Sequence, residues 1–257
     1  MNALRLLAPL VTALLLGCTP AAGPDTTSPG PPDLSGVWMA FAVENPDGGG
    51  NTPQYSAEGK ERLDAFASQF RSIPETGAWC LGTGMPGVMM SLVTYPIQIV
   101  QTPELIVMLA ELEMQLRRVY LDGREHSPDL LSSTAGHSVG KWEGDTLVID
   151  TALLSEWQVR PWPRSDQTRI VERVYLTKLG EVKARASGFI ADSVRPPVND
   201  DVLVVELTLS DPSYYEGPQR RNIYFQRMDD SATLEYLCTT EHWIDALEKQ
   251  RIKPEVL

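Results

Sequence analysis

Residues that bind metals or carry out redox chemistry are scarce in this chain. Its 257 residues include only three cysteines and three histidines. The histidines are His126, His137 and His242, and their spacing is not that of zinc ligands, so we expect no metal centre. The chain also lacks a Gly-rich phosphate-binding loop and a dinucleotide-binding fingerprint, so we expect no cofactor.

Basic side chains are also few. The chain has 22 Lys and Arg residues against 34 Asp and Glu residues, which gives a formal net charge of −12 at pH 7. An acidic surface repels both the phosphate backbone of nucleic acids and anionic lipid headgroups. We therefore expect no nucleic acid among the partners and no electrostatic docking on a membrane.

The N-terminal segment has the order of a secretory signal. Arg5 precedes an apolar run from Leu6 to Leu16 that is too short to span a membrane, which predicts a signal peptide over residues 1–17. Leu15-Leu16-Gly17-Cys18 resembles the lipobox of bacterial lipoproteins, and this implies that Cys18 is diacylated and becomes the first residue after cleavage. The alternative is an ordinary secretory signal followed by an unmodified cysteine.

The residues after Cys18 predict an anchored domain. Thr19 stands where an inner-membrane retention signal of the enteric type has Asp, so we expect an outer-membrane lipoprotein of the bacterial envelope, facing the periplasm or the surface. Two acyl chains suffice to hold a domain on a bilayer. Residues 18–33 contain five prolines and predict an extended tether, which leaves residues 34–257 as one domain.

The remaining two cysteines fit an oxidising compartment. With Cys18 acylated, Cys80 and Cys238 are the only thiols left, and disulfides persist in exported proteins. We expect these two residues to form a disulfide. The alternative is a pair of buried free cysteines.

Most of the domain has the sequence pattern of β-strands. Two segments have the apolar spacing of helices, residues 56–70 with a possible Ser56 cap and residues 239–250 with a possible Thr240 cap. The other segments alternate apolar and polar residues or are rich in β-branched residues. They are residues 36–43, 96–100, 105–112, 113–121, 137–142, 146–151, 168–176, 181–190, 201–209, 220–228 and 233–238.

Turn residues separate nearly all of these segments, and connections this short suit antiparallel neighbours. We therefore expect a mainly β fold. It should be an antiparallel meander that forms a lipocalin-like barrel or a two-sheet sandwich, with one helix near the N-terminus of the domain and one at its C-terminus.

Two motifs carry resemblances to known families. Gly36-Val37-Trp38 resembles the G-x-W of the first strand of lipocalins and related calycins, in which the tryptophan closes the floor of the barrel. The block SVGKWEGDTLVIDT at residues 138–151, with RRVYLDGREH, DLSGVW, SDPSYYEGP and EYLC, resembles a family of secreted bacterial proteins of unassigned function. The chain departs from that family in reading His126-Ser127-Pro128 for His directly before Pro. It also departs in ending TTEH after Cys238, where the family has an acid and Asn. The resemblance implies a fold and a compartment and assigns no reaction.

The segment GHSVG at residues 136–140 also matches the G-x-S-x-G pattern of serine hydrolases. A nucleophile elbow needs an apolar strand before the serine and a helix after it. Here a loop-like segment precedes Gly136, and a turn at Glu143-Gly144-Asp145 and a β-branched segment follow. We therefore interpret this stretch as a β-hairpin and do not expect Ser138 to be a nucleophile.

Two charged residues share strand faces with apolar neighbours. Alternation along residues 113–121 places Arg118 on the same face as Leu116 and Tyr120, and Glu172 also lies between apolar residues at a period of two. Because a buried unpaired charge is costly, we expect Arg118 and Glu172 to meet inside the barrel and bind the polar end of a ligand. The alternative is a structural ion pair, or side chains that reach solvent at strand ends.

The loop after this strand carries further polar residues, and binding residues often gather in loops at a barrel mouth. His126 and His137 supply imidazoles and Asp122 a carboxylate, which suffice for general acid–base chemistry. The candidate catalytic residues are His126, Asp122 and His137, and the candidate ligand-binding residues are Arg118, Glu172, Arg124 and Tyr120. The alternative is an ordinary polar turn, since Asp122-Gly123 is itself a hairpin signal.

Three functions are consistent with this sequence. The first is an envelope lipoprotein that binds a small apolar or amphipathic molecule in a barrel cavity. The second is an acid–base enzyme on the same scaffold, such as a hydratase, isomerase or hydrolase. The third is an envelope assembly or scaffold protein without a pocket.

Overall fold

A computed structural model shows how the chain folds. The structure describes residues 30–48, 52–69, 83–90, 95–158, 160–185, 200–228 and 233–235. The expected signal peptide, the lipidation site Cys18, the expected disulfide partners Cys80 and Cys238, and the helix expected over residues 239–250 lie outside the described residues. These four expectations stay predictions.

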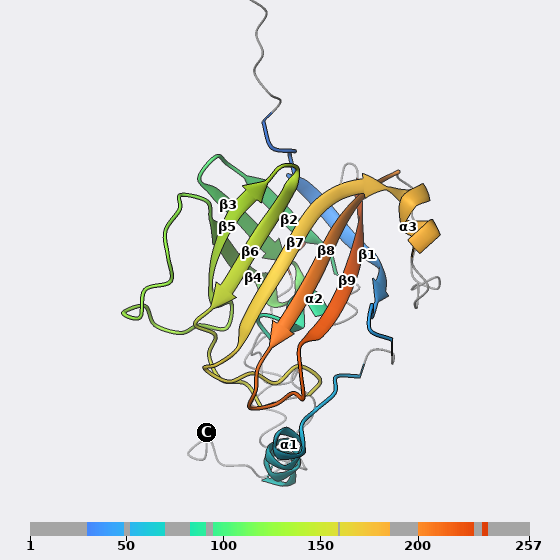
Figure 1. The fold of residues 1–257 in the computed structure, drawn as a ribbon. Helices are drawn as coiled ribbons and strands as arrows, with labels where there is room; N and C mark the ends of the chain where they lie inside the picture. The colour runs from blue at the N-terminus through green and yellow to red at the C-terminus, as the bar shows by residue number, and fades with distance from the viewer. Residues whose placement is uncertain are drawn as a thin grey trace, which may run out of the picture. The chain divides into compact units, whose positions relative to one another are not determined.

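Nine strands form a closed barrel, which confirms the mainly β fold and selects the barrel over the sandwich (Figure 1). They follow chain order around the barrel. Their bounds are β1 Gly36–Glu44, β2 Ile97–Gln101, β3 Leu105–Ala110, β4 Gln115–Tyr120, β5 His137–Glu143, β6 Thr146–Ala152, β7 Arg169–Lys178, β8 Asp201–Ser210 and β9 Gln219–Arg227.

One pair of neighbouring strands departs from the expected antiparallel meander. β4 and β5 pair in parallel, through only Val119↔Ser138 and Tyr120↔Val139, while the other eight pairings are antiparallel. A closed ring of nine strands cannot alternate direction at every step, so one parallel pair is unavoidable. A parallel pair needs a long crossover, and residues 121–136 provide it.

The alternating pattern of the strands buries one face of each in the barrel. Along β7, Ile170, Glu172 and Val174 are buried and their neighbours Val171 and Arg173 are exposed. The inward residues of most strands join one core cluster that also includes Trp38, Ile149 and Leu207. Period-two alternation in the sequence therefore located most strands, because only one face of the sheet packs inward.

The G-x-W motif opens β1, and its tryptophan belongs to the core cluster. Trp38 is fully buried, its indole Nε1 donates a hydrogen bond to the Leu34 carbonyl, and the Arg227 guanidinium lies 4.4 Å from its ring centroid. Gly36 has a φ of 137°, and a Cβ atom there would lie 2.5 Å from Arg227 Nη1. The glycine is therefore needed for its backbone conformation, since the end of the flexible Arg227 side chain can shift.

The G-x-S-x-G stretch is a hairpin, as expected. β5 pairs with β6 from His137↔Ala152 to Glu143↔Thr146, and Gly144 adopts a φ of 62° in the turn between them. Ser138 is fully buried in the barrel, and the element that follows its strand is β6 rather than a helix. The residues do not form a nucleophile elbow.

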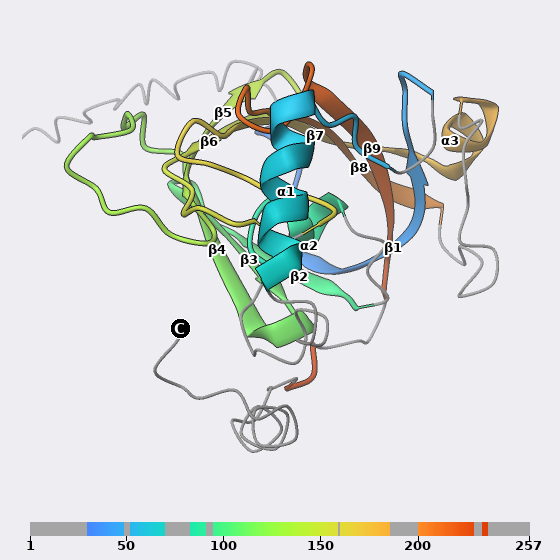
Figure 2. The same cartoon turned by 90° about the horizontal axis from the view of Figure 1, so that it is seen from below.

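The described residues contain three α-helices and one short 3-10 helix at Leu112–Met114. α1 (Ala57–Gln69) confirms the first expected helix, and Ser56 caps it by accepting a hydrogen bond from the Gly59 amide at 3.0 Å. α1 lies across one end of the barrel (Figure 2), where Gly59 packs directly against the Tyr214 backbone. α3 (Leu179–Arg185) corrects the strand expected over residues 181–190. No helix among the described residues is both long and apolar enough to cross a membrane.

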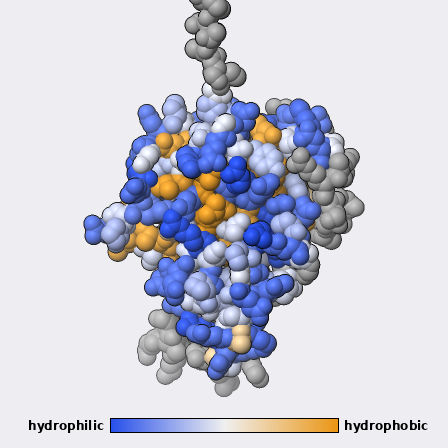
Figure 3. Space-filling view, in the orientation of Figure 1, coloured by the Kyte–Doolittle hydropathy of each residue, from blue (hydrophilic) through white to orange (hydrophobic). Residues whose placement is uncertain are grey.

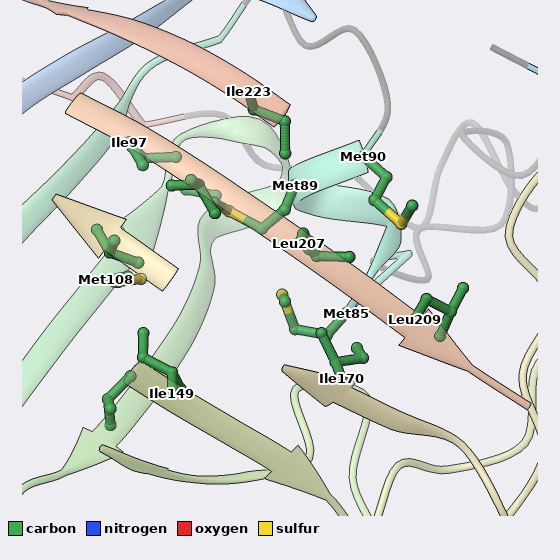
Figure 4. Close-up of a cluster of buried hydrophobic side chains, with 14 of the residues drawn as sticks. Met85, Met89, Met90, Ile97, Met108, Ile149, Ile170, Leu207, Leu209 and Ile223 are labelled. Atoms are coloured by element: carbon green, nitrogen blue, oxygen red, sulfur yellow. The ribbon is translucent and has the colours of Figure 1, made fainter. Parts of the chain in front are cut away.

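The remaining helix, α2 (Gly87–Met90), lies inside the barrel. It belongs to residues 83–90, which we call the plug. Met85, Met89 and Met90 are nearly fully buried, and Figure 4 shows them among side chains from several barrel strands, including Met108, Ile170 and Leu207. The sequence did not predict the plug, because these residues have no clear helix or strand period.

Candidate functional site

A buried ion pair lies inside the barrel, but its arginine is not the one expected. Arg117 donates two hydrogen bonds to the carboxylate of Glu172, from Nη1 to Oε1 at 3.0 Å and from Nη2 to Oε2. Glu172 is fully buried and Arg117 is only 5% exposed. Arg118, the expected partner of Glu172, is exposed on the outer face of β4.

The prediction that Arg118 rather than Arg117 points inward fails for a local reason. Glu113 and Met114, just before β4, have φ values of 57° and 49°, so the segment does not alternate from residue 113 as a continuous strand would. β4 begins only at Gln115, and Leu116 is 41% exposed while Arg117 and Val119 point inward. The pattern assigns the apolar Leu116 to the inner face, but Arg117 is the buried residue, because its hydrogen bonds offset the cost of burying its charge.

Two hydroxyl groups complete the interior polar cluster. Arg117 Nε donates to Ser138 Oγ at 3.1 Å, and Arg117 Nη2 donates to Thr151 Oγ1 at 2.9 Å. The two hydroxyls also share a hydrogen bond of 2.8 Å. Arg117 on β4 is thus tied to β5, β6 and β7 from inside, next to the short β4–β5 ladder.

The barrel interior next to this cluster is almost filled. A cavity of about 20 Å³ lies between the plug and the strands, lined by Gly84, Met85, Val88, Met89, Ile97, Met108, Ala110, Gln115, Leu116, Arg117 and Ala135. That volume holds about one water molecule. The space between the plug and these strands is therefore too small for a ligand in the described structure.

The plug is held at its first three residues. Arg164 Nη1 donates hydrogen bonds to the carbonyls of Thr83 and Met85, at 2.6 and 3.0 Å. The Gly84 amide donates to Gln115 Oε1 at 2.6 Å, and the Met85 amide donates to the Thr134 carbonyl at 2.9 Å. Arg164 is fully buried, and this burial lowers its pKa to about 10, so it stays charged at neutral pH.

The two expected catalytic histidines do meet, on the outer face of the barrel. His126, in the β4–β5 connection, and His137, at the start of β5, lie with their Nδ1 atoms 2.8 Å apart and their rings edge to face. His137 also stacks on Tyr120 of β4, with ring centroids 5.4 Å apart. The two strands of the parallel pair are therefore bridged from outside as well as from inside.

A carboxylate that the sequence did not suggest faces this pair. His126 Nε2 is buried and lies 3.8 Å from Asp150 Oδ2, beyond hydrogen-bond distance. Asp150 is itself held by Arg169, whose Nε donates to Asp150 Oδ1 at 2.7 Å. Alternation in β6 places Asp150 on the outer face, and its pairing with Val139 of β5 brings it near the histidines. Only strand pairing, which a single sequence does not reveal, could have identified it.

The other expected site residues are close by but differently arranged. Asp122 forms an ion pair with Arg124, whose guanidinium lies 3.7 Å from the Tyr120 ring centroid. Tyr120 and Arg124 therefore lie outside the barrel with His137, and of the four expected ligand-binding residues only Glu172 reaches the interior. Asp122 engages Arg124 and makes no described hydrogen bond to a histidine.

Burial lowers the pKa of both histidines. Desolvation is the main cause for His126, opposed by the negative charge of Asp150 and assisted by Arg169. Desolvation is also the main cause for His137, assisted by His126 and Arg124 and opposed by Asp122. Both imidazoles are consequently neutral at neutral pH, so one Nδ1 can donate and the other accept.

The described residues hold no group of three or more His, Cys, Asp or Glu side chains that could bind a metal ion. No protein-family model and no curated protein matches the chain. The resemblance of residues 138–151 to a secreted bacterial family therefore stays a prediction.

Proposed function

We propose that this protein is an exported envelope lipoprotein that binds a small, partly apolar molecule inside its barrel, in a state in which the plug has moved outward. The observation that carries this proposal is the methionine-rich plug, because it fills the space that a ligand occupies in a ligand-binding barrel. The cavity of about 20 Å³ is the remainder of that space.

The surface behind the plug suits an apolar guest. Val88 and Met89 of the plug face Ile97, Met108 and Ala110 of β2 and β3 across the cavity. Methionine side chains are unbranched and polarisable, and they adapt to guests of different shapes. An apolar ligand could therefore replace the plug side chains without leaving polar groups unsatisfied.

The way the plug is attached supports outward movement of its helical end. Its backbone hydrogen bonds to the barrel domain come from Thr83, Gly84 and Met85. In α2, the Met89 and Met90 amides donate to the Pro86 carbonyl within the plug itself. The helical end is thus held mainly by apolar packing, which a ligand can reproduce.

The Arg117–Glu172 pair serves a different role in this proposal from the one first expected. Arg117 lines the cavity, but its donors are already engaged by Glu172, Ser138 and Thr151. We assign the pair to holding the strands together around the ligand space rather than to binding the ligand's polar end.

The test is binding of an apolar fluorescent probe, N-phenyl-1-naphthylamine, with native mass spectrometry to establish stoichiometry. We expect saturable one-to-one binding that becomes several-fold tighter in Met89→Ala, which removes plug volume from the interior. Val100→Ala is the matched control. It also shortens an apolar side chain, but Val100 is 49% exposed, so the change adds no space to the barrel interior. Absence of saturable binding in both the wild type and Met89→Ala would contradict the proposal and favour a scaffold without a pocket.

The acid–base enzyme is the second candidate, and the 2.8 Å contact between His126 and His137 favours it. Two neutral imidazoles side by side can take up a proton and release one. Neither histidine lines the interior cavity, so this chemistry would take place on the outer face. Its test is a turnover screen with ester, enoyl and isomerisable ketone substrates. A pH-dependent activity that is lost in His126→Ala and retained in His242→Ala would support it.

A further inference from the structure

The connection between β4 and β5 contains a segment that the strands hold at a single point. We call residues 125–132 the arm; it lies within the loop that projects to the left in Figure 1. Among the described residues, the hydrogen bond that joins the arm to a strand is the one between the His126 and His137 rings, and His126 Nε2 also lies 3.8 Å from Asp150 Oδ2. The other hydrogen bonds of the arm, from the amides of Asp129 and Leu130 to Ser127, are internal.

The large apolar side chains of the arm are not packed against the barrel. Leu131 is 93% exposed and Leu130 is 43% exposed, so its two large apolar residues do not anchor it. Figure 3 shows apolar atoms on the projecting part of this face. The ends of the connection are better held, since the Leu121 amide bonds the Glu104 carbonyl and Ser133 bonds Leu153 and Ser155. The His126 contact therefore decides whether the arm lies against the barrel.

The contact between the histidines depends on how many protons the pair carries. With both rings neutral, one Nδ1–H donates to the other Nδ1. We place the donor on His137, because His126 can then carry its proton on Nε2, which faces the Asp150 carboxylate. The assignment of tautomers follows from this network.

The first added proton does not break the contact. It binds Nε2 of His137, and the resulting imidazolium still donates from Nδ1 to His126. A second proton must bind Nδ1 of His126, where it removes the acceptor and places two positive rings in contact. The two histidines therefore titrate as a pair, and the contact is lost in the second step.

We propose that the His126–His137 pair is a pH-operated fastener, which holds the arm on the barrel while the pair carries at most one extra proton and releases it when both rings are protonated. Release uncovers His137 on the outer side of the β4–β5 pairing. The proposal concerns the arm alone and does not depend on ligand binding.

The charged groups around the pair set the pH of release. Asp150 and Arg169 face His126 from β6 and β7, and their opposite charges partly cancel. Asp122 and Arg124 face His137 from the connection itself and also form an ion pair, beside the Tyr120 ring. Because burial and mutual repulsion both oppose the second proton, we expect release below the ordinary histidine pKa of about 6.5.

The test combines two NMR measurements on the protein between pH 8 and pH 4.5. Imidazole ¹⁵N shifts report the protonation and tautomer of each ring, and backbone ¹⁵N relaxation reports the order of residues 125–132. We expect order parameters near 0.85 while the pair is neutral or singly protonated, and below about 0.6 once both rings are charged. Residues of β7 and β8 should stay rigid throughout, which separates release of the arm from unfolding.

Two variants complete the test. His137→Phe keeps an aromatic ring against Tyr120 but has no Nδ1, so the arm should be mobile at every pH. His242→Asn removes the third histidine and should leave the transition unchanged. The proposal is overturned if the arm of His137→Phe is as ordered as that of the wild type. It is equally overturned if the arm stays ordered while both rings are shown to be charged, or if it loses order only with the whole barrel.

Discussion

The ion pair between Arg117 and Glu172 gives the sharpest test of how the barrel is held together. Glu172→Gln keeps the shape of the side chain and leaves the Arg117 guanidinium, which is 5% exposed, without a counter-charge. Removing one partner of a buried pair costs about 3–5 kcal/mol of the free energy of unfolding. Arg117→Met should cost a similar amount, because it leaves a fully buried carboxyl group without its cation.

The double variant Arg117→Met/Glu172→Leu should be more stable than either single variant. It buries no charge, and Ser138 and Thr151 keep a partner because their hydroxyls bond each other at 2.8 Å. Replacing a whole buried ion pair with apolar residues is often neutral or stabilising. The two single changes should therefore be strongly non-additive.

The assay is equilibrium unfolding in urea, followed by tryptophan fluorescence, with the midpoint and slope compared among variants. The control is Arg173→Met, one residue from Glu172 on β7, which breaks a surface pair with Glu143 whose side chains are 46% and 42% exposed. Exposed pairs contribute less than about 1 kcal/mol. Single variants at the buried pair that cost no more than this control, or additive effects in the double variant, would refute the reasoning.

Three further predictions address other parts of the molecule. Gly136→Ala should be more destabilising than Gly144→Ala in the same urea assay although both glycines have a positive φ, because a Cβ at Gly136 would lie 2.8 Å from the Ala152 carbonyl oxygen and one at Gly144 meets nothing within 4 Å. Cys18→Ser should abolish labelling with radioactive palmitate and move the protein from the membrane fraction to the soluble fraction. The free energy of unfolding should not depend on His126 and His137 above a pH of about 6.5, and it should decrease as the pH is lowered further. The reason is that both residues have a lowered pKa in the folded state, so the unfolded chain takes up protons first. A variant with both residues replaced by Gln should lose this part of the pH dependence of the free energy of unfolding.

The sequence predicted those elements whose burial follows a simple period. β7 alternates buried and exposed residues along its first half, so both its position and the inward direction of Glu172 could be predicted from one strand alone. α1 was predicted for the same reason, from its cap and apolar spacing. In each case the predictive signal is the spacing of apolar residues along one segment, which can be read without knowing that segment's partners.

The predictions that failed depend on contacts between distant residues. Arg117 points inward because Glu172, Ser138 and Thr151 on three other strands receive it, and no local pattern records those partners. The sequence pattern predicts a strand over residues 181–190, although α3 covers residues 179–185. The plug and the position of Asp150 likewise follow from tertiary packing and strand pairing rather than from local sequence.

The parallel β4–β5 pairing has the shortest backbone ladder of the barrel wall. β4 and β5 share two residue pairs, whereas β7 and β8 share ten. Because the backbone ladder is so short there, closure of the barrel depends on side chains, with Arg117 crossing inside and Tyr120, His137 and His126 crossing outside. These polar and aromatic side chains thus gather at the shortest backbone ladder of the barrel.

This arrangement predicts the order in which the barrel opens. Amide hydrogen exchange under native conditions should be faster for Ser138 and Val139 of β5 than for the central residues of β7 and β8, since short ladders open in local fluctuations that do not require global unfolding. Glu172→Gln weakens the inner crossing and should speed exchange in β5 more than global destabilisation alone does, whereas Arg173→Met should not. Uniform protection around the whole barrel would show that the wall is held cooperatively and that the parallel step is not a point of opening.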